Sequence, residues 1–177
     1  MSNHSLFKLN MLKYIKKDWC SMQEKLKRLF NEINLDESSY LYFNNSSIEK
    51  IILYDNNKMI EILINTENII PIDIYNLVLE KLSTYFNTFE VVKLIIIPNN
   101  IEYSMIKEYY LHIMNEVCKE RNKYQIFLER DIEIENNIIT IKAYNKIECT
   151  NLIGLKQELI DKLLYFGFKV ELNIQII

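Results

Sequence analysis

One order of sequence patterns occurs twice along the 177 residues, and this repetition constrains the fold more than any other feature. In each half, a helical pattern precedes two short β-rich runs, and a second helix and a final strand follow them. The repetition predicts an α+β protein of two similar small modules, each helix-strand-strand-helix-strand with a mostly antiparallel sheet and helices on one face. The break is expected near Pro98, so that the modules cover residues 1–100 and 101–177.

The spacing of apolar residues gives the expected elements. In the first half it predicts one amphipathic helix over 8–34, then strands at 48–54 and 59–64, a helix at 71–86 and a strand at 91–97. In the second half it predicts a helix at 102–118, strands at 131–135 and 138–144, a helix at 151–166 and a strand at 170–176. The strand at 91–97 is almost wholly apolar, which predicts burial on both faces. Gly167 is expected to end its helix with a positive φ.

The predicted modules are similar to KH folds, but they lack the G-x-x-G loop with which KH domains clamp nucleic acid. The sequence contains only two glycines, Gly154 and Gly167. They cannot form a glycine-rich phosphate loop either. No small-molecule substrate is therefore expected.

Charge and cysteine content narrow the class of protein further. The net charge is −3, which makes the whole molecule unattractive to nucleic acid or to an anionic membrane. Cys20, Cys118 and Cys149 lie far apart and the only histidines are His4 and His112, which argues against a zinc site and leaves no cofactor to expect. Free thiols and short apolar runs predict a cytoplasmic protein without a membrane partner.

Catalytic arrangements in the sequence are incomplete. Asp131, Glu133 and Glu135 alternate on one predicted strand, as in exonucleases that hold two metal ions, but no further acids complete the set. A solvated strand face is the simpler interpretation. His112 and Glu116 lie four residues apart on a helix, where a surface pair is expected. Cys118 has no histidine partner that would support a thiol nucleophile.

Basic residues near the N-terminus are the best binding candidates. Residues 1–34 carry seven Lys and Arg against three acids. They could meet DNA phosphates or an acidic partner, or they could form the ordinary solvated face of an amphipathic helix. The candidates are Lys13, Lys16, Lys17, Lys25, Lys27 and Arg28.

With this order of elements, residues 26–176 resemble the N-terminal region of the PolC-type DNA polymerase III alpha subunit. The stretches that carry the resemblance are Leu29–Ile33 followed by Tyr42-Phe43, Ile48–Ile51, Pro71 with Ile74-Tyr75, Leu82 and Phe86, Tyr109-Tyr110, Asn137–Lys142, and Tyr165–Phe168 followed by Leu172, Ile174 and Ile176. Residues 119–130 depart from the family, because they lack its prolines and small residues. The first twenty residues have no clear counterpart.

The resemblance implies a role in bacterial DNA replication. The family is a DNA-directed DNA polymerase, but its catalytic domains follow the region that this chain resembles. The implied role is therefore non-catalytic: a protein-interaction module within the replisome, with the clamp-loader tau subunit as a possible partner. The alternative is a module that binds single-stranded nucleic acid directly and weakly.

Overall fold

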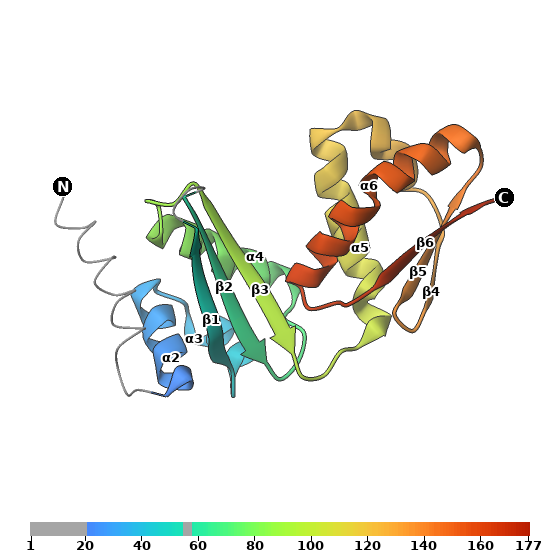
Figure 1. The fold of residues 1–177 in the computed structure, drawn as a ribbon. Coiled ribbons are helices and arrows are strands. Elements are labelled where there is room, and N and C mark those ends of the chain that lie inside the picture. Colours follow the sequence, from blue (N-terminus) through green and yellow to red (C-terminus); the bar gives the residue numbers. More distant parts are fainter. Residues whose placement is uncertain (1–20, 55–57) are drawn as a thin grey trace. The chain divides into compact units, whose positions relative to one another are not determined.

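The computed structural model describes residues 21–54 and 58–177 (Figure 1). The chain divides into two compact units between Asn99 and Asn100. No helix of the described residues is long and apolar enough to cross a membrane.

The first unit contains a three-stranded sheet with strand order β1-β2-β3. β1 and β2 pair antiparallel, while β3 pairs parallel to β2 because the chain crosses over through α4 before it returns. Its elements are α2 (Met22–Glu32), α3 (Glu37–Tyr40), a 3₁₀ turn (Leu41–Phe43), β1 (Ser47–Tyr54), β2 (Met59–Thr66), α4 (Ile72–Tyr85) and β3 (Val91–Pro98).

Helix α2 begins at a capping box, which corrects the expectation of one helix over 8–34. Ser21 has an extended backbone (φ −59°, ψ 153°), its hydroxyl accepts from the N–H of Glu24, and the Glu24 carboxylate accepts from the N–H of Ser21. A helix therefore starts at Met22 and cannot run through Ser21. The helix ends at Glu32, and Asn34 two residues later has a φ of 52°, which lets the N–H of Leu35 reach the carbonyl of Phe30.

The core of the first unit lies between one face of the sheet and its helices. The Tyr75 hydroxyl donates to the carbonyl of Leu94 (2.7 Å) and joins α4 to β3. The expectation that β3 is buried on both faces is wrong, because β3 is an edge strand and its residues are buried fully only at Leu94 and Ile96. The buried side chains include Leu26, Leu29, Phe30, Phe43, Ile60, Ile62, Ile64, Val78 and Leu82.

The second unit repeats this topology with strand order β4-β5-β6. Its hairpin is antiparallel across Asn136-Asn137, with Asn136 at φ 54°, and β6 pairs parallel to β5. The elements are a 3₁₀ turn (Tyr103–Met105), α5 (Ile106–Glu120), a second 3₁₀ segment (Asn122–Phe127), β4 (Ile132–Glu135), β5 (Ile138–Ala143), α6 (Lys146–Tyr165) and β6 (Glu171–Ile176).

Two arginines connect residues 121–130 to α6 through hydrogen bonds to its glutamates. Arg121 donates to both carboxylate oxygens of Glu158 at 2.7 and 2.6 Å. Arg130 donates to Glu148 at 2.9 Å and lies over the ring of Tyr144 at 3.9 Å. These contacts order the segment in which the sequence departs from the family it resembles.

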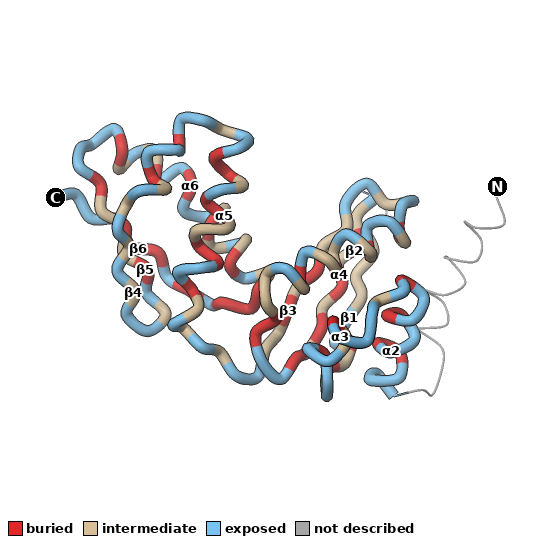
Figure 2. The backbone as a smooth tube through the Cα atoms, turned by 180° about the vertical axis from the view of Figure 1, so that it is seen from behind, coloured by how far each residue is buried: buried red, intermediate tan, exposed pale blue. Residues whose placement is uncertain are grey.

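The α+β class and the two similar modules are confirmed. In Figure 2 the buried stretches, drawn in red, recur along helices and strands in each module. The antiparallel part of the prediction holds for each hairpin, and each sheet as a whole is mixed because its third strand is parallel to the second.

Candidate binding surfaces

The predicted basic residues divide into three groups. Lys13, Lys16 and Lys17 lie outside the described residues. Lys27 and Arg28 are exposed on α2, and their role in binding stays a prediction.

Lys25 differs from Lys27 and Arg28, because it is buried, with an exposed fraction of 8 %. The buried arc of α2 includes Lys25 and Phe30 as well as Leu26 and Leu29, so it is wider than the apolar stripe in the sequence. A lysine at the flank of such an arc has its aliphatic stem covered by neighbouring side chains. Lys25 is therefore not part of an exposed basic face.

The acidic strand β4 belongs to a solvated sheet face. Glu133 and Glu135 are exposed, and Glu133 pairs with Lys142 on β5 at 2.5 Å. The Glu133 carboxylate raises the pKa of Lys142, first through the hydrogen bond and then through its charge. Within residues 21–54 and 58–177, no group of three or more His, Cys, Asp or Glu side chains is placed to hold a metal ion.

The remaining candidates occupy the helices of the second module. The His112 Nε2 lies 3.5 Å from Glu116, whose other oxygen lies 3.6 Å from Lys162 on α6. Cys118 is buried, and burial raises the pKa of its thiol, which disfavours the reactive thiolate. The contact between Glu116 and Lys162 links α5 to α6.

The outward face of the first sheet was not predicted as a site, and it is rich in aliphatic side chains. The strand register places Lys50, Leu63 and Ile95 in one row across the sheet. The next row is Ile52, Glu61 and Lys93, in which the lysine lies 3.3 Å from the glutamate. A third row consists of Tyr54, Met59 and Val91.

The same face of the second sheet is polar. Its rows are Glu133, Thr140 and Asn173, and Glu135, Ile138 and Glu171. The two modules therefore share a topology but differ in the chemistry of their outward faces. A sequence signal for this difference exists: β2 and β3 contain apolar residues at successive positions, whereas β6 alternates regularly between polar and apolar residues.

Comparisons with known proteins match this chain to one polymerase family. The family described as DNA polymerase III polC-type N-terminus I matches residues 25–96, which run from α2 into β3. The DNA polymerase III PolC-type of Oceanobacillus iheyensis is 26 % identical over 135 residues, which is 75 % of this chain and 10 % of that protein. The chain thus spans about a tenth of the length of this relative. No solved structure matches the chain. The predicted resemblance to the N-terminal region of PolC-type DNA polymerase III is therefore confirmed, with the family match in the first module at residues 25–96.

Proposed function

We propose that this chain acts in bacterial DNA replication as a non-catalytic protein-interaction module of the replisome. The observation that carries the proposal is the family match over residues 25–96, which covers nearly the whole described core of the first module. The matched relative is named a DNA polymerase III, and the region matched is a small part of it. Glu61, Glu116 and Glu133 lie in ion pairs with lysines, and no group of three or more His, Cys, Asp or Glu side chains among the described residues is placed to hold a metal ion.

The outward faces of the two sheets favour a protein partner over nucleic acid. Tight general binding of single strands needs aromatic platforms in a positive groove. The outward face of the first sheet is mainly aliphatic, with Ile52, Leu63 and Ile95 among its residues. Its aromatic residue Tyr54 donates its hydroxyl to Glu61, and Lys93 is paired with the same glutamate. The second sheet presents several carboxylates, which repel phosphates.

Weak binding of single-stranded DNA is the second candidate function. The exposed positions of Lys27 and Arg28 on α2 favour it, because these side chains can approach a phosphate backbone. Such binding would be electrostatic and would weaken steeply as salt is raised.

For the first candidate function, the clamp-loader tau subunit is the protein partner that the resemblance suggests.

The test is a direct comparison of the two ligands on the purified full chain. Biolayer interferometry with the immobilised tau subunit and fluorescence anisotropy with labelled oligo(dT) are run between 50 and 300 mM salt. We expect saturable binding of tau that persists at 300 mM salt and DNA binding that is lost at that salt. A chain that binds oligo(dT) tightly and none of the purified clamp-loader and helicase proteins contradicts the proposal.

A charge reversal then tests whether the exposed basic residues of α2 take part in binding or only form a solvated helix face. The double variant Lys27→Glu, Arg28→Glu should slow association with an acidic partner several-fold, because surface charge acts mainly on the association rate. The variant Lys146→Glu, an exposed lysine in the other module, is the control. Equal association rates for the wild-type chain and the double variant would show that this face of α2 is only solvated.

A further inference from the structure

Strand β6 has one edge that pairs with no strand of the described chain. Its other edge pairs with β5: the N–H of Glu171 donates to Asn137 and the N–H of Ile177 donates to Ala143. Backbone groups alternate in direction along a strand, so the N–H and C=O groups of Leu172, Ile174 and Ile176 point to the unpaired edge. Such an edge is a template for another extended chain.

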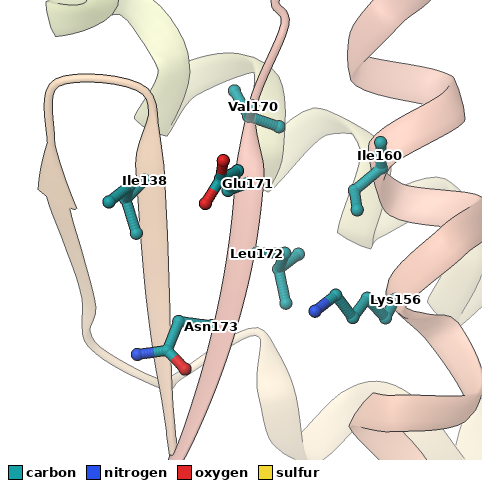
Figure 3. A pocket seen from close by; sticks show the side chains of 7 residues that line it. All are labelled: Ile138, Lys156, Ile160, Val170, Glu171, Leu172 and Asn173. Atoms are coloured by element: carbon teal, nitrogen blue, oxygen red, sulfur yellow. The ribbon is translucent and has the colours of Figure 1, made fainter.

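Helix α6 flanks this edge and leaves a hollow of about 520 Å³ beside it. Lys156 and Ile160 line the hollow from α6, and Val170, Leu172 and Asn173 line it from the β6 segment. Figure 3 shows the side chains of Lys156 and Ile160 extending from the helix toward the strand. An added strand would therefore place every second side chain against α6.

The side of α6 that borders the hollow carries exposed apolar side chains beside Lys156. Ile153, Ile160 and Leu164 recur with Lys156 at steps of three and four residues, so they share one side of the helix. Ile153 is 59 % exposed and Leu164 is 40 % exposed. The core of this module uses a different stripe: Leu152, Leu155, Leu159 and Leu163.

We propose that the β6 edge and this side of α6 bind an extended peptide segment of a partner protein, which adds to the sheet as a fourth strand. The segment carries apolar side chains toward Ile153, Ile160 and Leu164 and one acidic side chain toward Lys156. This inference rests on the proposed function, since it names the kind of partner segment and its binding site. β-strand addition combines main-chain hydrogen bonds with side-chain pockets in this way.

The charges at the hollow favour a peptide over a nucleic acid. Among the described residues that line it, Lys156 is the one cation, and Glu171 places a carboxylate at the same hollow. None of the described residues that line the hollow is aromatic, so they offer no ring on which a base could stack. A peptide segment would match both charges if it placed an acidic side chain against Lys156 on α6 and a basic side chain beside Glu171 on the outward face of the sheet.

The probe is a synthetic acetylated peptide, Thr-Ile-Thr-Glu-Lys-Ile-Thr-Ile, titrated into the ¹⁵N-labelled full chain. We expect saturable amide shifts and slowed amide exchange at Leu172, Ile174 and Ile176. The same peptide, N-methylated at the residues whose N–H groups face β6, should not bind, because it cannot donate backbone hydrogen bonds to β6. Absence of saturable binding by the unmodified peptide overturns the proposal, as does protection of these amides by oligo(dT) or by self-association of the chain.

Matched variants locate the binding site. Lys156→Glu should weaken the peptide at least tenfold, and Lys146→Glu on the same helix should not. Ile153→Gln should weaken it several-fold, while Ile147→Gln, at an isoleucine 75 % exposed outside the hollow, should leave it unchanged. If Lys156→Glu and Ile153→Gln bind peptide and tau like the wild-type chain, this inference fails and the proposed function stands. If the chain binds no replisome protein, the proposed function fails separately.

Discussion

At the scale of single residues, Gly167 shows a position where the backbone requires glycine. Its φ is 96°, its N–H donates to Leu164, and the N–H of Phe168 donates to Leu163, which closes the C-terminus of α6. The predicted positive φ is confirmed. Gly167→Val should lower the free energy of unfolding by about 1–2 kcal/mol, because a β-branched side chain clashes at positive φ. Urea unfolding checks this, and an unchanged midpoint would contradict it.

Gly154 provides the opposite case within the same helix. It lies in the middle of α6, and a Cβ added there meets no atom within 4 Å. Glycine in a helix interior costs about 0.5–1 kcal/mol relative to alanine. Gly154→Ala should therefore raise the free energy of unfolding by about that amount in the same urea experiment. A lower unfolding midpoint for this variant would contradict this prediction and show that a contact outside α6 requires glycine at this position.

The conformation of Gly167 could be predicted because it depends on neighbouring residues in the chain alone. Gly167 follows an apolar helical pattern and precedes Phe168, which is enough to predict a left-handed cap. The burial of Lys25 could not be predicted, because a charged residue at the flank of an amphipathic helix is ordinarily solvated and only the tertiary packing of the module covers it.

At the scale of elements, Asp36 is the cap of α3 and the source of a pH dependence. Its carboxylate accepts from the N–H of Ser39 at 2.9 Å and from the hydroxyls of Ser38 and Ser39. These hydrogen bonds, with that from Ser38 first, hold the pKa of Asp36 well below its usual range.

A lowered pKa in the folded state means that Asp36 stabilises the fold above its unfolded pKa of about 3.9 and loses this contribution as the pH falls further. The melting temperature of Asp36→Asn should therefore fall less than that of the wild-type chain between about pH 4 and pH 2. Calorimetry over this range, with Asp161→Asn on the surface of α6 as the control, measures the difference. Parallel curves for wild type and Asp36→Asn would contradict the role of this cap.

Glu148 joins three parts of the second module. Its carboxylate accepts from Arg130 at 2.9 Å, from the N–H of Tyr144 at 2.9 Å and from Asn145 at 3.3 Å. The side chains of Arg130 and Glu148 are 14 % and 10 % exposed. Glu148→Ala should cost about 3 kcal/mol of unfolding free energy, because it leaves a buried guanidinium without its partner.

The matched control for this pair is Glu133→Ala, which removes a carboxylate from an ion pair on the outward sheet face. Its cost should stay below about 1 kcal/mol. The double variant Arg130→Met, Glu148→Met should be more stable than Glu148→Ala, since it removes both charges together. Equal costs for Glu148→Ala and Glu133→Ala in chemical denaturation would refute the structural role of Glu148.

The elements themselves were largely predictable, because their apolar periods are regular and their turns carry Asn, Pro or Gly. The start of α6 was missed: the expected helix at 151 begins at Lys146, where Asn145 caps the N–H of Glu148. That Asn-x-x-Glu pattern is visible in the sequence, so the earlier start could have been found. The position of β3 at an edge could not be found, since it follows from pairing between distant segments.

At the scale of the whole molecule, the two modules have the same topology and different surfaces. The aliphatic outward face of the first sheet could have been inferred from unbroken apolar runs in β2 and β3. The hollow beside β6 could not, because it depends on which strand lies at the edge and on how α6 packs against it. The burial of Lys25 depends on tertiary packing in the same way, because the sequence does not show which lysine of α2 other side chains cover.

Amide hydrogen exchange distinguishes a chain that binds a replisome protein, as proposed, from one that binds DNA. The exchange of the full chain is measured alone, with the purified clamp-loader tau subunit and with oligo(dT), at 150 mM salt. We expect tau to slow exchange in a contiguous set of peptides and oligo(dT) to change the exchange little. Slowed exchange with oligo(dT), together with an unchanged pattern in the presence of tau and the other replisome proteins, would contradict it.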